Sequence, residues 1–303
     1  MSLSSDNAPV VSVVIPAFNR CDSLLLLLRD VYRQVGVSFE VIVVDDHSSE
    51  DPTPRLLAEF PDTRVLRHRV NSGPAAARNR GIRAARGRII VGFDSDVTVP
   101  DPSVLTRAVA TLAHHGAVDG LAFRLLQSDG QSEDVPRWWH SRPVSWAGRR
   151  FATTYFSGTA YAFRRDALIR SGLFPEFFFM HYEEVELAFR LLDRGGTILY
   201  CPELAVLHHA HPVSRRSEIK VFYKPRNQVL LAVSCLPWPR ALLYLIPRLG
   251  YQLLTAARHG HLPAFMKALR SAGQLLPDRL AERRVLQPAT LRRIAALRAG
   301  AAA

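Results

Sequence analysis

Residues 9–18, PVVSVVIPAF, carry the first strong signal of the fold class of this chain. Its β-branched apolar residues, and the proline near its end, are typical of a short strand that is buried on both faces. A leucine-rich helix is expected next, at residues 21–34, with Asp22 or Ser23 as its N-cap. A second buried strand follows at residues 39–51. Buried strands that alternate with helices pack as a parallel sheet, so this opening predicts an α/β fold.

The same alternation of strand and helix continues as far as residue 96. Apolar strands are expected at residues 63–70 and 87–96, and helices at residues 51–60 and 73–85. This βαβαβαβ order predicts a mostly parallel sheet flanked by helices. Ligands of such sheets bind beyond the carboxyl ends of the strands, so we expect the functional residues at that edge.

Polar residues follow each of the four expected strands. The two carboxylates of GFDSDV, at residues 92–97, fit either a solvated turn or a bound divalent cation. Because the four strand ends converge on one crevice, the pattern favours bound Mg²⁺ or Mn²⁺. The chain has no glycine-rich dinucleotide motif after its first strand and no P-loop motif. The polar residues are Asn19, Arg20, Asp45, Asp46, Asn71, Asp94 and Asp96.

The middle of the chain predicts a long loop followed by a strand and a helix. The loop covers residues 127–150 and holds Trp138, Trp139 and Trp146 among polar residues. These indoles serve either as core anchors or as a stacking platform for a ligand. Residues 151–168 then predict a strand that leads into a helix.

The next two segments carry further candidate functional residues. Residues 180–196 predict an amphipathic helix that ends at glycine. The apolar, extended segment that follows ends in His208, His209 and His211. Histidines gathered at a strand end are candidate metal ligands, and carboxylate with histidine suits Mn²⁺ as well as Mg²⁺.

The composition indicates one large domain with an appendage, in a reducing compartment. The three cysteines are far apart and odd in number, so neither a disulfide framework nor a zinc site is expected. The polar residues 1–8 include no hydrophobic signal region and are expected to be disordered.

The positive charge lies in the last third of the chain. Residues 213–303 hold 16 Lys or Arg and 3 Asp or Glu, whereas the first 212 residues have a net charge of −1. Residues 227–270 are apolar but broken by prolines and arginines, which argues against a membrane-spanning helix. The pattern fits helices lying in an anionic membrane interface, or a helical cap on the catalytic domain, and both can hold at once.

Eight fragments, in order, resemble one family. They are VSVVIPAFNR, EVIVVDDHSSED, NSGPAAARNRG, GFDSDV, GTAYAFRRDAL, HYEEVELAFRLLDRGG, PELAVLHH and FYKPRN. Over about residues 11–230 the chain resembles the inverting glycosyltransferases of family 2, with members in polysaccharide assembly and rhamnosyl transfer. The resemblance implies a GT-A fold, a nucleotide-diphosphate sugar as donor, and a glycan or lipid-linked acceptor.

The resemblance also implies roles for residues on the donor side. Asp46 corresponds to the residue that accepts a hydrogen bond from the nucleotide base. The carboxylates of the GFDSDV motif and a histidine correspond to ligands of Mn²⁺ or Mg²⁺, namely Asp94, Asp96 and His208. The remaining donor-site residues implied are Pro16, Ala17, Asn19, Arg20, Arg78, Asn79 and Ser95.

The general base implied by the resemblance lies in the acidic pair of YEEVEL. The family usually has Glu-Asp there, whereas this chain has Glu183 and Glu184. Glu184 corresponds to the base, with Glu183 beside it. The extra methylene of glutamate moves the carboxylate outward from the position that aspartate gives it.

These observations predict an enzyme with a defined organisation. We expect a GT-A catalytic domain at residues 9–226 and a basic, apolar helical extension at residues 227–303, held peripherally on the cytoplasmic face of the cell membrane. Two other classes remain as alternatives. A sugar-1-phosphate nucleotidyltransferase would carry a glycine-rich basic loop where this chain has AFNRCDS, and a nucleic-acid-binding protein would need a reading module that the sequence lacks. The sugar, the nucleoside, the acceptor and the oligomeric state are left open.

Overall fold

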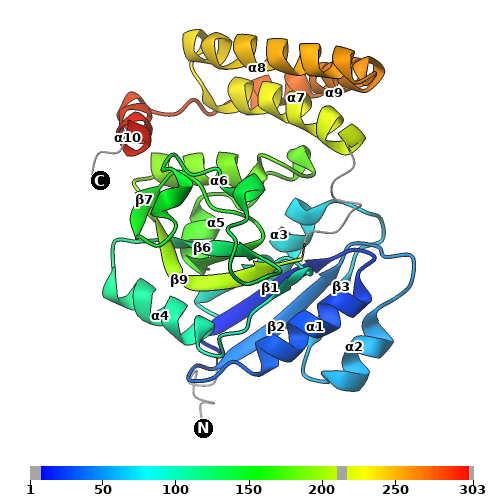
Figure 1. The fold of residues 1–303 in the computed structure, drawn as a ribbon, viewed down its shortest axis with the longest axis vertical. Helices are drawn as coiled ribbons and strands as arrows, with labels where there is room; N and C mark the ends of the chain where they lie inside the picture. The colour runs from blue at the N-terminus through cyan, green and yellow to red at the C-terminus, as the bar shows by residue number, and fades with distance from the viewer. Residues whose placement is uncertain (1–7, 210–216, 300–303) are drawn as a thin grey trace.

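A computed structural model of the chain describes residues 8–209 and 217–299 (Figure 1). The predicted disorder of residues 1–8 falls almost wholly outside this part of the chain. Figure 1 shows a sheet with helices against it, and a layer of helices stacked beyond α6, on the side away from the sheet. The expected α/β fold with a helical C-terminal extension is confirmed.

The first four strands form the parallel half of the sheet, in the order β3-β2-β1-β4. Ala17 pairs with Asp45 in register, so the carboxyl ends of β1 and β2 lie side by side. The strands are β1 (Val11–Ala17), β2 (Phe39–Asp45), β3 (Arg64–Arg67) and β4 (Ile89–Phe93), and the helices between them are α1 (Cys21–Tyr32), α2 (Thr53–Glu59) and α3 (Pro74–Ala84).

The start of α1 differs from the sequence prediction. Arg20 occupies the N-cap position and no side chain caps the helix, so the expectation of Asp22 or Ser23 as N-cap is wrong. The Asp22 carboxylate instead accepts a hydrogen bond from Arg55 of α2 at 2.8 Å. Asp22, which could have capped α1, therefore forms an ion pair with helix α2 instead.

The second half of the chain adds antiparallel strands, so the complete sheet of nine strands is mixed. β8 runs antiparallel between β4 and β6, and β9 pairs with β5, β6 and β7. The elements are β5 (Val97–Thr98), α4 (Val104–His114), β6 (Gly120–Gln127), β7 (Phe151–Thr153), β8 (Ala160–Arg164), α5 (Arg165–Arg170), α6 (Glu183–Asp193) and β9 (Ile198–His208).

Two apolar clusters cover the two faces of the sheet. Alternate side chains of β1 point to opposite faces: Val13 and Ile15 pack with α1 and α4, whereas Val14 packs with α3 and α6. Trp138 and Trp146 pack against the second cluster, so two of the three loop tryptophans anchor the core. This double cover explains why the strands read as continuous apolar runs.

The C-terminal helices pack on the catalytic domain through a third cluster. Phe189 and Leu192 of α6 lie in it together with buried residues from all four of these helices. The predicted border between residues 226 and 227 falls inside α7 and stays a prediction. The four helices are α7 (Ser217–Cys235), α8 (Trp238–Arg258), α9 (Leu262–Ala281) and α10 (Pro288–Ala299).

Candidate active site

The carboxyl ends of β1 and β2 enclose a pocket of about 210 Å³. Asn19, with φ 53°, accepts a hydrogen bond from the Ser49 backbone at 2.8 Å, and its own N–H donates to the Ser48 hydroxyl at 2.8 Å. These bonds tie the loop after β1 to the loop after β2. Of the residues predicted to bind the donor, Ala17, Asn19 and Arg20 line this pocket, and Pro16 is buried next to it in β1.

Asp46 lies at the same edge and holds the start of α3. Its carboxylate accepts hydrogen bonds from the backbone N–H groups of Ser72 at 2.9 Å and Gly73 at 2.7 Å. His68 Nδ1 lies 2.7 Å from the same carboxylate. A carboxylate at a helix N-terminus is stabilised by the helix dipole and by unpaired N–H groups, so Asp46 has a structural task in the free protein.

Asp94 follows β4 and pairs with a buried arginine. Arg78, in α3, donates a hydrogen bond to Asp94 Oδ1 at 2.7 Å and to Glu183 Oε1, in α6, at 3.3 Å. Burial alone would lower the pKa of Arg78, but the carboxylates of Asp94, Glu184 and Glu183 raise it above its usual value. Arg78 therefore remains a fixed cation that joins the end of β4 to the start of α6.

Asp96 lies two residues further on and faces a different set of partners. Arg20 donates a hydrogen bond to its carboxylate, and His208 Nε2 lies 3.6 Å from Asp96 Oδ2. The other ring nitrogen of His208, Nδ1, lies 2.9 Å from Asp134 Oδ2. Burial alone would raise the pKa of Asp96, but His208 and Arg20 lower it to about 2. The carboxylate is therefore ionised throughout the working range of pH.

The fit of this region to a divalent cation can be judged from its donor atoms. Within residues 8–209 and 217–299, no three His, Cys, Asp or Glu side chains gather closely enough to hold a metal ion. Asp94 turns to Arg78, whereas Asp96 and His208 face each other. Asp134 behind His208 orients the imidazole as carboxylates commonly do for metal-binding histidines. The donor set has the chemistry for Mn²⁺ or Mg²⁺, and Asp94 would join it by turning from Arg78.

The two glutamates open α6 and differ in access. Glu183 is almost wholly buried against Arg78, whereas Glu184 keeps part of its surface exposed. Glu184 Oε1 accepts a hydrogen bond from the backbone N–H of Gly158 at 3.1 Å. A Cβ at position 158 would lie 2.5 Å from Arg78 Nη2 and 2.6 Å from Glu184 Oε1. Glycine at this position therefore lets the main chain approach both groups.

Burial raises the pKa of Glu184 above that of an ordinary glutamate, although Arg78 opposes the shift. Burial raises the pKa of Glu183 well above its usual range, and the neighbouring charge of Glu184 adds to the effect. Three buried polar atoms close by have no hydrogen-bond partner among the described residues, namely Arg78 Nε, Glu183 Oε2 and Tyr161 Oη. The site thus holds an unusual concentration of unsatisfied polar groups.

A strained loop positions the first turn of α6. Phe179, His181 and Tyr182 all have positive φ, at 65°, 66° and 74°, and the helix expected from residue 180 begins only at Glu183. The Asn227 amide, from α7, donates to the carbonyls of Phe178, Met180 and His181 at 3.1, 2.7 and 2.8 Å. The C-terminal extension therefore contributes directly to the geometry of the candidate base.

Some predicted residues do not join this cluster. The Asn79 amide donates to the Phe174 carbonyl at 2.7 Å and accepts from the Phe174 N–H at 2.8 Å, so it ties α3 to the loop after α5. Ser95 is buried between the two aspartates. His209 lies 3.0 Å from Thr98 Oγ1 rather than at the carboxylates. His211 lies outside the described residues.

Sequence reasoning missed three residues of the cluster: Asp134, Gly158 and Asn227. Asp134 stands in a polar loop 74 positions from its partner His208, and no local pattern marks it. Gly158 is the first residue of the fragment GTAYAFRRDAL, and Asn227 is the last residue of the fragment FYKPRN. For these two residues, the match of the surrounding fragments was a signal that could have been followed.

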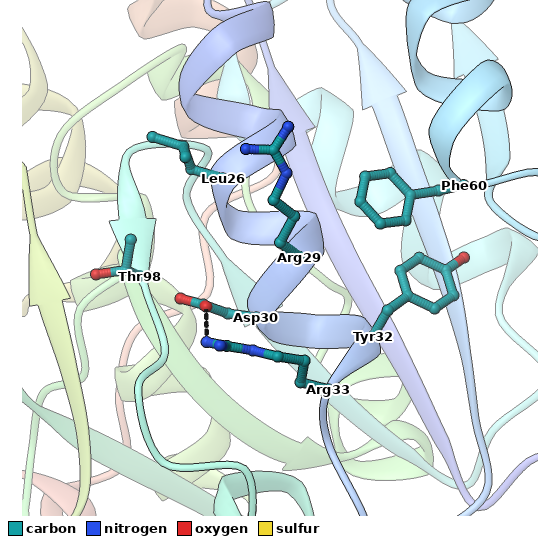
Figure 2. A pocket seen from close by; sticks show the side chains of 7 residues that line it. All are labelled: Leu26, Arg29, Asp30, Tyr32, Arg33, Phe60 and Thr98. Atoms are coloured by element: carbon teal, nitrogen blue, oxygen red, sulfur yellow. Dashed lines mark hydrogen bonds and ion pairs between the residues drawn. The ribbon is translucent and has the colours of Figure 1, made fainter.

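A second, larger hollow of about 560 Å³ lies along α1 (Figure 2). Figure 2 shows Arg33 paired with Asp30 on one side of it and Phe60 beside Tyr32 on the other. It contains none of the residues predicted to act in catalysis or donor binding. The smaller pocket at the ends of β1 and β2 is therefore the better candidate for the donor, because predicted donor-site residues line it.

The fold and the site together define a glycosyltransferase of the GT-A type. The model of the family described as Glycosyl transferase family 2 matches residues 12–172, which is more than half of the chain. The chain belongs to this family. The match ends before the glutamates of α6 and the histidine of β9, so those residues are supported by geometry and by resemblance only.

Three known proteins illustrate the relationship. The succinoglycan biosynthesis protein ExoO of Rhizobium meliloti (strain 1021) is 42% identical over 132 residues, which cover 42% of this chain and 37% of ExoO. The chain therefore matches a little over a third of that relative's length.

Two solved structures share the fold. The mannosyltransferase PcManGT from Pyrobaculum calidifontis, in complex with GDP-Man and Mn²⁺, has a TM-score of 0.60 at 22% identity, covering 97% of this chain and 85% of that one. S. aureus TarS 1–349 in complex with UDP-GlcNAc has a TM-score of 0.61 at 20% identity, covering 90% and 83%. Similarity at this level of identity concerns the fold.

Proposed function

We propose that this glycosyltransferase is metal-dependent and inverting, and moves a sugar from a nucleotide-diphosphate donor to a hydroxyl group. One observation carries the proposal: Arg78 joins Asp94, on the donor side, to Glu183, next to the candidate base. Residues 105 positions apart in the sequence thereby form one compact polar centre. The neighbours that bind GDP-Man and UDP-GlcNAc support a nucleotide sugar as donor.

The donor nucleotide occupies the edge formed by β1, β2 and β4. Ala17, Asn19 and Arg20 line the pocket, and Pro16 is buried next to it in β1. Asp46 accepts a hydrogen bond from the base with a lone pair that its present partners leave free. The further donor-side residues proposed are Arg78, Asn79, Asp94 and Ser95. Arginines near a diphosphate provide fixed, bidentate positive charge.

Asp94, Asp96 and His208 are proposed to hold Mn²⁺ or Mg²⁺. The PcManGT complex, which contains Mn²⁺, supports a metal in this fold. When bound, the cation neutralises charge on the leaving nucleoside diphosphate. Arg20 and Arg78 neutralise the two aspartates in the free protein, and both guanidinium groups become available to the donor's phosphates once these carboxylates change partners.

Glu184 is proposed as the general base, with Glu183 as its neighbour in the same turn. The acceptor oxygen attacks the anomeric carbon while its proton passes to a Glu184 carboxylate oxygen. The bond from the anomeric carbon to the diphosphate oxygen breaks in the same displacement, and the configuration inverts. Glu184 suits this role better than Glu183 because it is partly exposed, and burial raises its pKa above that of an ordinary glutamate, which makes it a stronger base.

The acceptor is proposed to be a glycan or a lipid-linked glycan. Trp139 stacks on Tyr155, with ring centroids 5.7 Å apart, and lies 5.4 Å from Tyr182, which immediately precedes the glutamates. Trp139 thus resembles the stacking platform considered from sequence, whereas the other two loop tryptophans belong to the core. The name of ExoO supports a role in polysaccharide biosynthesis.

The location proposed is the cytoplasmic face of a membrane, with residues 9–226 catalytic and residues 227–303 as the attached extension. The positive charge of the extension supports this location. No helix among the residues described is long and apolar enough to cross a membrane.

The proposal is tested by the variant Asp96→Ala. We expect transfer to be abolished and Mn²⁺-dependent donor binding, measured by calorimetry, to weaken, while circular dichroism shows a folded protein. Screening UDP-, GDP- and dTDP-sugars identifies the donor for this test. Asp166→Ala, which removes an exposed ion pair with Arg170 on α5, is the matched control. Transfer that survives in Asp96→Ala, or that persists undiminished in EDTA, would contradict metal dependence.

A further inference from the structure

Helix α8 is apolar on two opposite faces, of which only one has a partner. Its inner face contributes Ala241, Tyr244 and Leu245 to the cluster that joins the extension to α6. Its outer face, which we name the α8 stripe, is open to solvent. The members of the α8 stripe are Leu242, Leu243, Ile246, Leu253 and Leu254.

The α8 stripe is continuous along the helix. Its residues recur at intervals of one, three and seven positions, which places them on one side of an α-helix of 3.6 residues per turn. Leu243 is 75% exposed, Ile246 68% and Leu254 60%, so folding buries little of the apolar surface of these side chains. Gly250 and Ala257 share the same side, so no polar residue interrupts the stripe.

The length and position of α8 fit a role of the α8 stripe in binding a partner outside the chain. α8 has 21 residues, and Figure 1 shows it along the edge of the molecule farthest from the sheet. Large apolar patches that are open to water mark interaction sites.

The charge around the α8 stripe indicates what that partner is. From residue 219 to residue 277 the chain has eight Lys or Arg and no Asp or Glu. Arg240 and Arg258 are exposed, and their spacing of 18 residues places both at the same flank of the helix, next to the exposed Tyr251. An apolar face bordered by arginine and tyrosine matches the boundary between acyl chains and headgroups.

We propose that the α8 stripe lies in the interface of an anionic lipid bilayer, with α8 parallel to the membrane plane. The inference rests on the proposed location at a membrane and assigns that location to one helix face. Pairing of the α8 stripe with a second copy of the chain is disfavoured, because two such copies would bring exclusively positive flanks together.

Vesicle flotation tests the assignment. We expect the full-length protein to float with vesicles of phosphatidylcholine and phosphatidylglycerol, and to float less without phosphatidylglycerol. The double variant Leu243→Glu/Ile246→Glu places two charges in the acyl region and should lose at least about tenfold in bound fraction. Raising salt from 0.1 to 1 M shortens the Debye length from about 10 to about 3 Å, so release by salt should be partial, whereas detergent releases all protein.

A matched control introduces two glutamates in place of exposed aliphatic residues on the catalytic domain, away from the α8 stripe. Leu26→Glu/Ile169→Glu changes two exposed aliphatic residues, in α1 and α5, and should float like the wild type. Arg240→Gln/Arg258→Gln should keep flotation but lose part of the preference for phosphatidylglycerol. All variants should hydrolyse donor in solution at the wild-type rate, which shows that they are folded.

Each other outcome has a defined meaning. Equal flotation of wild type and Leu243→Glu/Ile246→Glu overturns the assignment to the α8 stripe. A wild type that stays unbound and sediments as a dimer, with the same double variant monomeric, shows that a second copy covers the stripe and overturns membrane docking. Flotation of a protein that hydrolyses no nucleotide sugar leaves the docking surface standing and removes the proposed function instead.

Discussion

Glu184 combines two properties that act against each other. As a base it must lose its proton, yet burial raises its pKa and favours the protonated form. Because the pKa is higher in the folded than in the unfolded state, the folded protein binds more protons in that interval. The free energy of unfolding therefore falls as pH rises from the ordinary glutamate pKa through the raised one.

This reasoning predicts the effects of Glu184→Gln. The glutamine side chain is neutral at every pH, so the free energy of unfolding of the variant should not fall with rising pH on account of this position. The variant should therefore unfold at a higher temperature than the wild type near pH 8. Its kcat should fall by about 10²–10⁴, with donor binding unchanged. Thermal unfolding over a pH series and steady-state kinetics measure the two effects.

Glu183→Gln serves as the comparison for the base assignment. Glu183 is 2% exposed and its carboxylate faces Arg78, so the loss of this carboxylate should reduce kcat less than the loss of the Glu184 carboxylate. A reversed ranking would move the base to Glu183. Near-normal rates for both variants would place the base outside α6.

Helix α7 holds the loop before α6 in place. Asn227→Ala removes the donor to three backbone carbonyls and should cost about 1–3 kcal/mol of stability. The loop with positive φ at Phe179, His181 and Tyr182 is then free to relax, which displaces the first turn of α6. We expect kcat to fall while the donor KM stays near the wild-type value.

The neighbouring residue provides the control for this prediction. Gln228, on the same turn of α7, donates to the Tyr182 hydroxyl at 2.5 Å but to none of the loop carbonyls. Gln228→Ala should therefore leave kcat nearly unchanged. If Asn227→Ala lowers stability and keeps full kcat, packing rather than Asn227 holds the base in place.

The first half of the fold could be predicted because its signals are local. Runs such as residues 11–17 and 39–45 are apolar on both faces, and the parallel register then brings Asn19 close to Ser48 and Ser49 without further information. The sequence predicts a helix from residue 180, three residues before α6 begins. The difference arises because contacts with α7 fix a left-handed backbone at His181 and Tyr182, and helix propensity carries no signal of these contacts.

The candidate site could be predicted as a set of strand ends but not as a set of partners. That Asp94 meets Arg78, whereas Asp96 meets Arg20 and His208, depends on the side-chain geometry of three elements. The position of Asp134 beside His208 could not be predicted, because Asp134 lies in a loop of 24 residues, at 127–150, that has no periodic pattern.

The C-terminal helices and the catalytic domain share one apolar cluster. Deleting residues 227–303 would expose Phe178, Phe189 and Leu192 and remove Asn227. We therefore expect the shortened protein to aggregate, or to bind hydrophobic dye strongly, rather than to behave as a free catalytic domain. Size-exclusion chromatography and dye fluorescence measure this.

Thermal unfolding gives the complementary result for the full-length chain. A shared cluster predicts a single cooperative transition, monitored both by circular dichroism and by the fluorescence of Trp238 in α8 and the tryptophans of the loop. Two separate transitions, or a soluble and active protein after the deletion, would show that the cluster contributes little to the stability of the catalytic domain.

Arg78 is bonded to Glu183, and Asn227 is bonded to the loop that precedes Glu183. These bonds also limit how segments of such enzymes can recombine in evolution. The recognisable family region ends at residue 172, and it would be natural to recombine relatives there. A crossover at that point would take Arg78 and Asn79 from one parent and their partners in residues 174–183 from another. Productive chimaeras should instead inherit α3, α6 and α7 together, so the unit of inheritance is larger than the unit of sequence similarity.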